Sequence, residues 1–373
     1  MCGSLVFLFF GGRRFEVCFE LGDCVPPRSF IPCGLFDISA KYGKKTAQNK
    51  KLAFLSIKLY NIIWQNNKKR RIYSSDGIFV SLMKMFPVEL GVSTLIGNVL
   101  PEMVRDMSRL EVSHYDLPSE ALPEEFDGLK IVQLSDLHNK KYGKYNFELY
   151  KRICHENPDI IVMTGDMISH NAPNMHDFIA LVRMLCKKYP VYYVNGNHEN
   201  SDMDVHTFKS VAARFEQFGA KCVDNAYVNL KRGNASIRLC GLCYSARFYR
   251  GVRNYKINWS EFTLDDMIRY CGIKPKDQYT ILLAHNPLDF DIHAEWGADI
   301  SFGGHIHGGF IRLPLVGGIV SPELKLFPKY KEGVYKKGKS WLVVSRGLGR
   351  IRFFNPPELV SVTLHSKKKR KDK

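Results

Sequence analysis

The chain contains no uninterrupted apolar run of the length that a membrane-spanning helix requires, which is about 20 residues. Its most apolar stretches are too short or are broken by charged residues: 5–10, 52–64 and 77–100. The first is no typical export signal, because Arg13 and Arg14 follow the apolar run instead of preceding it. We therefore expect no membrane span. For Ile78–Leu100 a short helix packed on the core is favoured, with an amphipathic segment on a membrane surface as the alternative.

A disulfide framework is also missing. The ten cysteines are scattered and several lie within apolar patterns, unlike those of small secreted, disulfide-bonded domains. Cys240 and Cys243 form a lone C-x-x-C pair, and the sequence lacks the second pair that a structural zinc site needs. We expect free, structural thiols and a reducing, cytoplasmic environment, with peripheral membrane association left open.

Acidic residues are too few to balance the basic ones, and the net charge is +17. The surplus lies in two terminal arms. Residues 1–73 have nine more basic than acidic residues and residues 366–373 have five more, which leaves a surplus of three between them. Such arms favour polyanions, including nucleic acid and anionic membranes, or serve only as solvated tails. The near-neutral central region argues against nucleic acid as the partner of a site there.

The sequence has no internal repeat and divides into four parts. Residues 1–75 are expected to form a basic, weakly structured N-terminal extension. Residues 76–128 are expected to be a short helical segment and a linker, because 117–127 holds two prolines and a run of acids. Residues 129–365 form the main domain, and 366–373 a basic tail.

Apolar runs alternate with helical periodicity in the first half of the main domain. Expected strands at Leu129–Leu134, Ile160–Thr164 and Val191–Val194 alternate with expected helices at Asn146–Glu156, Met175–Lys187 and Val205–Phe218. This alternation predicts a parallel sheet covered by helices. After Gly219 the pattern predicts strands without intervening helices, and a second sheet packed on the first would bury them. We therefore predict an α/β fold, a four-layer α/β/β/α sandwich with two mixed sheets.

Short polar motifs follow most of these strands. Ligands in open α/β sheets lie at the carboxyl ends of the strands, so we expect the motif side chains to converge on one edge. Two carboxylates, one amide and four imidazoles there would form a mixed oxygen and nitrogen donor set for divalent metals. The motifs are Asp136-Leu137-His138, Gly165-Asp166, Gly196-Asn197-His198-Glu199, His285-Asn286-Pro287 and Gly303-Gly304-His305-Ile306-His307-Gly308-Gly309.

The motifs differ in specificity. Strand alternation is expected to send Asp136 and His138 to the same side, although such a pair alone is also typical of a turn beside a surface histidine. Asp166 closes a fully apolar strand, where an unpaired carboxylate is costly, and this favours a ligand. His305 and His307 are flanked by glycines, which contribute little to a core strand, and alternation again points both imidazoles the same way. Together and in this order, the motifs favour a metal site.

These motifs resemble the signature of the calcineurin-like metallophosphoesterases, which reads D-x-H, G-D, G-N-H-[DE], a lone His and G-H-x-H. The resemblance runs from about Glu111 to His365. Within that superfamily the chain is most similar to the YkuE-like bacterial group. The supporting stretches are Leu122–Lys130, His305–Gly309 followed by Leu313-Pro314, and Ser345–Gly349 followed by Asn355–Glu358.

The resemblance implies a role for each motif residue. One metal ion would be bound by Asp136, His138, Asp166 and His307. The second would be bound by Asp166, Asn197, His285 and His305, so that Asp166 bridges the two ions. His198 would bind no metal and would protonate the leaving oxygen, with Glu199 orienting it. The implied catalytic residues are therefore His198, Glu199 and Asp166.

The implied activity is that of a two-metal phosphohydrolase, acting on phosphodiesters or phosphomonoesters. Two ions about 3.5–4 Å apart would share a hydroxide that attacks phosphorus in line. His198 would donate a proton to the departing oxygen as general acid. Imidazole and carboxylate ligands suit Mn, Fe, Zn or Co better than Mg or Ca and leave the choice among them open. The family commonly has threonine in place of Ile306 and glutamine in place of Phe310, departures that concern substrate contacts.

The expected partner is a small phosphoester, with a lipid- or nucleotide-linked phosphate as the leading class; no protein partner is inferred. A nuclease is one alternative, for which Tyr244–Lys256 supplies a basic, aromatic segment that could equally be a lid over a phosphorylated head group. A non-catalytic metal-binding protein at a membrane surface is the other. The presence of both Asp166 and His198 argues against it.

Three residues outside the motifs carry weaker expectations. Arg346 could contact a substrate phosphate or lie on the surface as an ordinary arginine. His170, four residues after Asp166, could contact a substrate, although a histidine without a role in the site is the favoured interpretation. His293 falls in a helical stretch and is expected at the surface or half buried.

Overall fold

The computed structural model describes ten stretches of the chain, which are 5–10, 13–18, 109–168, 175–201, 205–249, 260–309, 312–313, 317–318, 329–349 and 355–367. They belong to two units, Met1–Ile72 and Tyr73–Lys373, each described here by itself. In the first unit, β1 (Leu5–Phe10) pairs with the antiparallel strand β2 (Arg13–Cys18). Both strands lie in the segment that the sequence predicts to be weakly structured.

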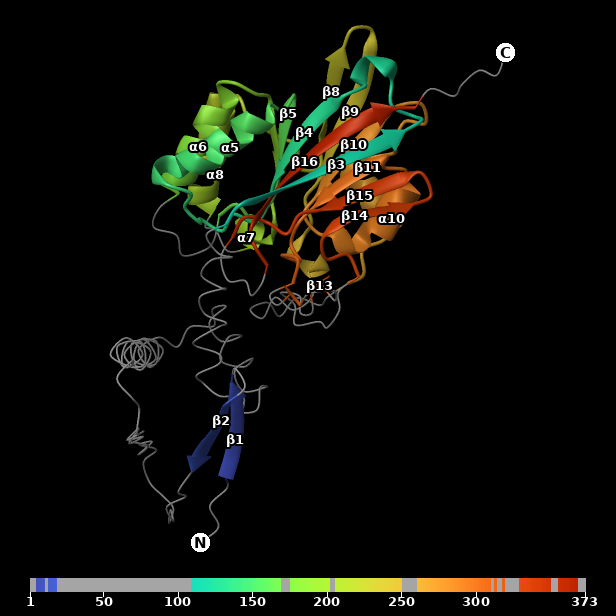
Figure 1. The fold of residues 1–373 in the computed structure, drawn as a ribbon. Coiled ribbons are helices and arrows are strands. Elements are labelled where there is room, and N and C mark those ends of the chain that lie inside the picture. Colours follow the sequence, from blue (N-terminus) through green and yellow to red (C-terminus); the bar gives the residue numbers. More distant parts are fainter. Residues whose placement is uncertain are drawn as a thin grey trace. The chain divides into compact units, whose positions relative to one another are not determined.

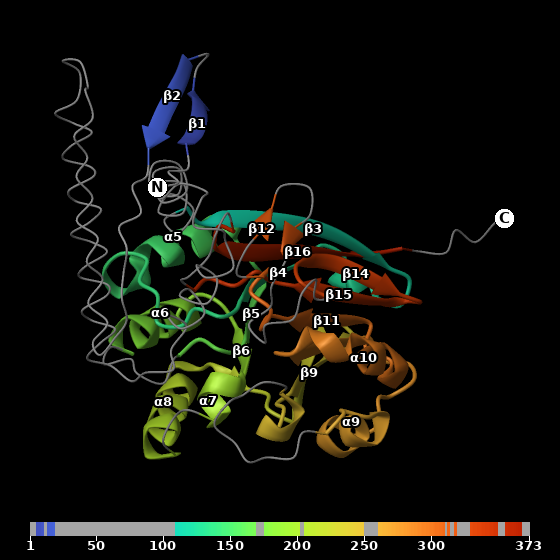
Figure 2. The ribbon, with the colours of Figure 1, turned by 90° about the horizontal axis from the view of Figure 1, so that it is seen from below.

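The first large sheet of the second unit has six strands in the order β3-β16-β4-β5-β6-β7. Strands β4 to β7 run parallel, and β16 joins β4 to the edge strand β3. Three helices pack on one face of this sheet (Figures 1 and 2). The bounds are Glu111–Ser119 (β3), Leu129–Leu134 (β4), Ile160–Thr164 (β5), Val191–Val194 (β6), Lys221–Cys222 (β7), Glu358–Ser366 (β16), Phe147–Glu156 (α5), His176–Cys186 (α6) and Val205–Phe218 (α8).

The second large sheet also has six strands, in the order β14-β15-β11-β10-β9-β8. Its four central strands are parallel and its two edge strands are antiparallel. Two helices pack on its outer face. The bounds are Tyr227–Arg232 (β8), Ala235–Leu242 (β9), Thr280–Ala284 (β10), Ile300–Gly303 (β11), Gly333–Lys337 (β14), Ser340–Val344 (β15), Leu264–Cys271 (α9) and Phe290–Trp296 (α10).

The two sheets face each other across the main hydrophobic core. Alternation along a strand separates the layers: on β4, Ile131 packs in the core between the sheets, and its neighbour Val132 packs beneath the helices with Leu149 of α5. This arrangement confirms the predicted α/β/β/α sandwich. Shorter elements complete the unit: Asn197–Ser201 (α7), Arg312–Leu313 (β12), Gly317–Gly318 (β13) and the 3₁₀ turns Glu124–Phe126 (η2), Lys144–Asn146 (η3), Ala246–Phe248 (η4) and Pro287–Asp289 (η5).

Two elements differ from the sequence expectations. Glu111–Ser119 lies in the range expected to be helix and linker, yet it forms β3 beside β16. Pro118 is tolerated there because an edge strand has a neighbour on one side only. The region after Gly219 is expected to lack helices, yet α9 and α10 lie within it. These helices have 8 and 7 residues, too few to produce a sustained period.

No helix within the described ranges is both long and apolar enough to cross a membrane. Several sequence expectations fall on residues outside those ranges and are not tested by the structure. They concern Ile78–Leu100, His170, residues 250–256 of the basic aromatic segment, and the tail after Lys367.

Candidate metal centre

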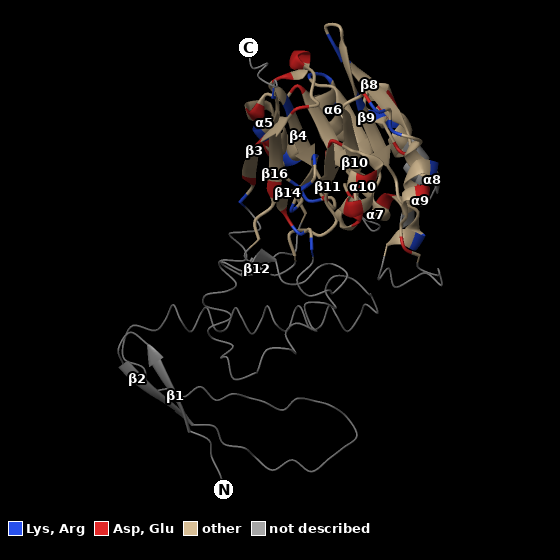
Figure 3. Cartoon of the chain, turned by 90° about the vertical axis from the view of Figure 1, so that its right-hand side faces the viewer, with Lys and Arg blue, Asp and Glu red and all other residues tan. Residues whose placement is uncertain are grey.

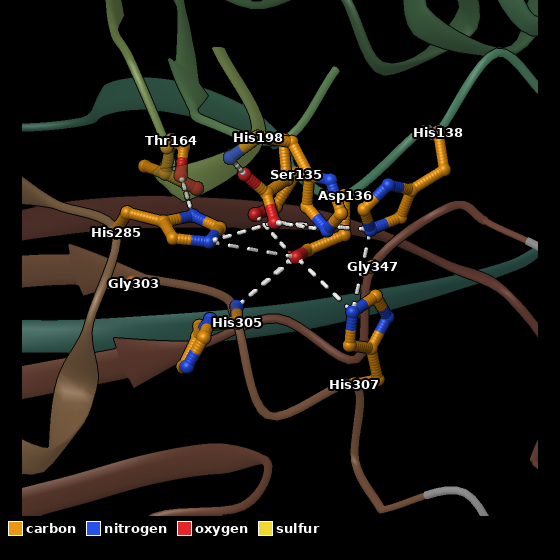
Figure 4. Close-up of polar contacts among 12 residues, drawn as sticks. Ser135, Asp136, His138, Thr164, His198, His285, Gly303, His305, His307 and Gly347 are labelled. Carbon is orange, nitrogen blue, oxygen red and sulfur yellow. Dashed lines mark hydrogen bonds and ion pairs between the residues drawn. The ribbon is translucent and has the colours of Figure 1, made fainter. Parts of the chain in front are cut away.

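The polar motifs meet at one edge of the two sheets, where strands of both sheets end (Figure 4). Each expected ligand lies in the turn that follows a strand, so that parallel strands deliver their side chains to a common place. Strands β4, β5 and β6 are followed by Asp136, Asp166 and Asn197, strand β10 by His285, and strand β11 by His305 and His307. Of these, Asn197 is the first residue of α7 and supplies an amide instead of an ionisable group.

One cluster contains Asp136, His138 and His307, whose ligand atoms all lie within 4.8 Å of one another. Nε2 of His307 is 3.6 Å from Oδ1 of Asp136 and 3.4 Å from Nε2 of His138. Asp166 adjoins this cluster, because its Oδ2 is 3.9 Å from Nε2 of His138. These four are the side chains that the resemblance assigns to the first metal ion.

A second cluster contains Asp166, His285 and His305. Oδ2 of Asp166 lies 3.2 Å from Nε2 of His285, and the His285 and His305 rings are 5.1 Å apart between centroids. Asp166 also belongs to a third group, with His138 and His198. It therefore lies between the two clusters, where a bridging carboxylate is expected.

The hydrogen bonding of His285 shows that this position suits a metal ion. Nδ1 of this buried imidazole donates to the carbonyl oxygen of Thr164 over 2.6 Å, which leaves Nε2 as the free ligand atom. A lone pair on Nε2 would face the Asp166 carboxylate at 3.2 Å, so a proton or a metal ion must lie near it. Burial lowers the pKa of His285, but Asp166, Asp136 and the hydrogen bond to Thr164 together outweigh burial and raise the pKa to about 10. A positive charge beside Nε2 of His285, from a proton or a metal ion, is therefore favoured.

The backbone of the ligand loops is unusual. Asp136, His138, Asp166, His305 and His307 have φ values from 45° to 65°, in the left-handed region that non-glycine residues rarely adopt. Such a conformation costs about 1–2 kcal/mol per residue and is typical of functional sites. The predicted convergence of Asp136 and His138 holds, because both join one cluster, although left-handed turns and not strand alternation bring them there. His305 and His307 do not point the same way along a strand: one joins each cluster.

Burial controls the charge of the carboxylates. It raises the pKa of Asp136 above the ordinary value. Burial has the same tendency at Asp166, but the charges of His285 and His198 bring the pKa of Asp166 well below its ordinary value. Burial and the nearby Asp166 raise the pKa of Glu199 to about 7. Three carboxylates buried this close together need compensating positive charge, which divalent cations supply.

His198 and Glu199 lie beside the clusters. Nε2 of His198 is 3.8 Å from Oδ2 of Asp166, and its side chain is 35% exposed, so solvent and substrate can reach it. The Glu199 carboxylate accepts hydrogen bonds from the backbone N–H groups of Asp166, Ile168 and Gly196, all at 2.9–3.0 Å. These bonds hold the loop that carries Asp166.

The loop after β15 supports the ligand loops. Asn355 is buried, and its Nδ2 donates to the carbonyl oxygens of His307 over 2.6 Å and Gly309 over 2.8 Å. The backbone N–H of Leu348 donates to the carbonyl oxygen of Ser135, next to Asp136. Sequence reasoning singled out these stretches as family features but missed the role of Asn355. An asparagine before two prolines carries no metal-site signature.

Two further expectations need correction. Arg346 is neither a substrate contact nor a surface residue: it is buried, and its guanidinium is 3.0 Å from a Glu111 carboxylate oxygen and 3.3 Å from one of Glu358. Its charge is thus compensated inside the protein. His293 is a core histidine whose Nε2 lies 2.8 Å from the Tyr244 hydroxyl, and burial lowers its pKa to about 3. Helical periodicity could not place it because α10 has only two turns.

We expect Asn355→Leu to weaken metal binding at the His307 side of the centre. The change keeps the volume but removes both hydrogen bonds to the loop that carries His307. Losses of this kind typically lower metal affinity about 10- to 100-fold. Titration of the metal-free full chain with Mn(II), followed by electron paramagnetic resonance, should show one weakened ion and one unchanged. Asn229→Leu, on β8, serves as the control, and equal weakening of both ions would contradict the prediction.

Comparison with known proteins identifies a matching family model and several similar proteins. A family model described as calcineurin-like phosphoesterase matches residues 129–309. The metallophosphoesterase YkuE of Bacillus subtilis is 30% identical over 268 residues, which are 69% of this chain and 86% of that protein. UDP-2,3-diacylglucosamine pyrophosphatase LpxG of Chlamydia muridarum is 26% identical over 64% of this chain and 85% of its own length. A solved dimetal phosphatase from Danio rerio aligns with a TM-score of 0.40 and 10% identity, covering 64% and 94% of the two chains.

Proposed function

The chain belongs to the calcineurin-like phosphoesterases and is a metal-dependent phosphoester hydrolase, and we propose that its substrates are phosphate or diphosphate esters linked to a lipid. The observation that carries the proposal is the position of Asp166 between two clusters of ligand atoms at one sheet edge. The lipid-linked substrate class is suggested by the LpxG relative, which is named for a diphosphate of a diacylated sugar.

Each cluster supplies the donors for one ion. In this proposal, the first ion would be held by Asp136, His138, Asp166 and His307, and the second by Asp166, Asn197, His285 and His305. The mixed imidazole and oxygen donors favour Mn, Fe, Zn or Co, with Mn the first choice to test. When bound, the ions supply Lewis-acid chemistry: they lower the pKa of water and neutralise charge on the phosphoryl oxygens.

The residues around the ions have separate tasks. His198 reaches the solvent-facing side of the centre and donates its Nε2 proton to the leaving oxygen as that oxygen departs. Asp166 accepts the backbone N–H of His198 at 2.9 Å, which fixes the start of the turn that carries the imidazole. Glu199 holds the Asp166 loop through its three backbone hydrogen bonds. Asp166 and Glu199 are therefore positioning residues as well as charges in the site.

Hydrolysis by the full chain tests the proposal. After removal of metal by a chelator, the protein should not hydrolyse bis(p-nitrophenyl) phosphate, and Mn(II) should restore turnover. Among physiological classes, a UDP-linked diacylated amino sugar should be hydrolysed faster than UDP-N-acetylglucosamine. No turnover with any of the four metals, despite binding of metal, would favour the non-catalytic alternative.

Nucleic acid is the competing substrate. Basic and acidic residues are interspersed over the strands and helices that Figure 3 colours, which gives no support to a groove tracking a phosphate backbone. Short DNA or RNA duplexes should therefore be poor substrates. Rapid cleavage that falls steeply with salt would instead identify a nuclease.

A further inference from the structure

Two large aromatic side chains are exposed at the start of α5: Tyr145 lies just before the helix, and Phe147 is its first residue. Tyr145 is 47% exposed and Phe147 48% exposed, whereas most large hydrophobic side chains that the structure describes in the second unit are buried. Lys144 and Lys151 accompany them. Nζ of Lys144 lies 5.1 Å from the centre of the Tyr145 ring, and Nζ of Lys151 lies 5.5 Å from that of Phe147. These four residues are called the aromatic–lysine patch below.

The backbone conformation and hydrogen bonds of this loop keep the Tyr145 side chain exposed. Tyr145 and Asn146 have φ values of 56° and 55°, a conformation that costs a non-glycine residue about 1–2 kcal/mol. Two hydrogen bonds from the backbone to side chains offset this cost. The Asp177 carboxylate of α6 accepts the backbone N–H of Tyr145 over 2.9 Å, and Oδ1 of Asn146 accepts that of Tyr142 over 2.8 Å. A strained backbone that is supported from two sides indicates a displayed residue with a function.

The composition of this segment suits the interface of an anionic bilayer. Residues 141–152 contain four basic residues and one acid, Glu148, which pairs with Lys151. Aromatic rings settle at the level of lipid head groups, and lysine stems lie along apolar surface while their ammonium groups meet the phosphates. Phe147 also stacks on Tyr150 with ring centres 5.9 Å apart, which enlarges the apolar surface.

The patch and the metal centre share one loop. The chain leaves β4, passes through Asp136 and His138, and reaches Tyr145 seven residues later, before α5 begins. A bilayer bound by the patch would therefore lie close to the edge of the sheets where the ligands gather. We propose that the aromatic–lysine patch docks the protein on an anionic membrane surface. This goes beyond the proposed function and does not depend on turnover.

Vesicle flotation of the full chain tests whether Tyr145 and Phe147 contribute to membrane binding. Phosphatidylcholine vesicles with about 30% phosphatidylglycerol are used at about 0.5 M salt, where the basic arms are largely screened. Tyr145→Ser/Phe147→Ser should lower the partition coefficient about tenfold, because two interfacial rings are lost. Tyr227→Ser is the matched control, since Tyr227 is 50% exposed and carries Arg238 over its ring, but lies on β8 of the other sheet. It should bind like the unaltered chain.

The lysine part is tested at low salt. Lys144→Gln/Lys151→Gln should weaken binding to the anionic vesicles about tenfold at about 0.1 M salt. It should not change binding to pure phosphatidylcholine. Vesicle binding that is unchanged in the aromatic variant, or reduced equally by Tyr227→Ser, would overturn the proposal.

The outcomes separate docking from catalysis. The aromatic variant should hydrolyse bis(p-nitrophenyl) phosphate at the rate of the unaltered chain, because none of its changed residues belongs to the metal centre. Slower turnover of this small soluble substrate would mean that the rings serve the site itself, and would count against docking. An unaltered chain that binds vesicles but has no turnover would leave docking supported and contradict the proposed function alone.

Discussion

Asp166→Asn is expected to remove almost all turnover, by about 10⁴-fold in kcat/KM, because Asp166 would bridge the two metal ions of the proposed centre and its loss would disturb both. Asp166 is the residue whose oxygen approaches three imidazoles, at 3.2 Å from His285, 3.8 Å from His198 and 3.9 Å from His138. An amide of the same size removes the negative charge that holds these groups together. Metal analysis of the purified variant should show that fewer than two ions remain bound.

Asp299→Asn provides the control for this substitution. Asp299 is also a largely buried aspartate, and it accepts the backbone N–H of Thr280 and faces Lys274, away from the metal centre. Its variant should keep both ions and normal turnover, although its stability should fall by about 1–3 kcal/mol. If Asp166→Asn retained two tightly bound ions and more than a tenth of its activity, Asp166 would not be the bridge.

The clustering of these carboxylates and imidazoles could be predicted from the sequence, because the polar motifs follow the ends of strands. Asp166 follows a fully buried strand and His285 follows another, and short apolar runs bounded by turn signals are consistent with buried strands. Parallel strands then deliver such residues to one edge whatever the details of the loops. The prediction therefore did not depend on the conformation of any single turn.

The side-chain directions and the supporting contacts of the site could not be predicted. They depend on turns and long-range contacts that leave no periodic signal in the sequence. The directions of His305 and His307 follow from left-handed turns, so the rule of alternation failed. The backbone hydrogen bonds of Glu199 come from loops that the fold brings together, and the sequence shows only a neighbour of His198. Asn355 and Arg346 act on residues 48 and more than 200 positions away. Such pairings exist only once the sheets are assembled.

His198→Ala is expected to lower turnover by an amount that depends on the leaving group. A general acid contributes about 10²–10⁴-fold where the leaving oxygen is strongly basic. With an alkyl phosphodiester such as a methyl ester, kcat should therefore fall about 10²–10⁴-fold. With bis(p-nitrophenyl) phosphate, whose leaving group departs without a proton, the loss should be only several-fold. A plot of log kcat against leaving-group pKa should be steeper for the variant than for the unaltered chain.

Metal content distinguishes a general-acid role of His198 from a role as a metal ligand. His198 also lies in a group with His138 and Asp166 whose ligand atoms are within 4.8 Å of one another, so it could itself be a ligand. A ligand's removal would lower metal stoichiometry and slow every substrate by a similar factor. A general acid's removal leaves both ions bound and spares the good leaving group. His155→Ala, at an imidazole that is 81% exposed, should change neither quantity. Because the two roles predict opposite outcomes in both assays, the pair of measurements assigns His198 to one of them.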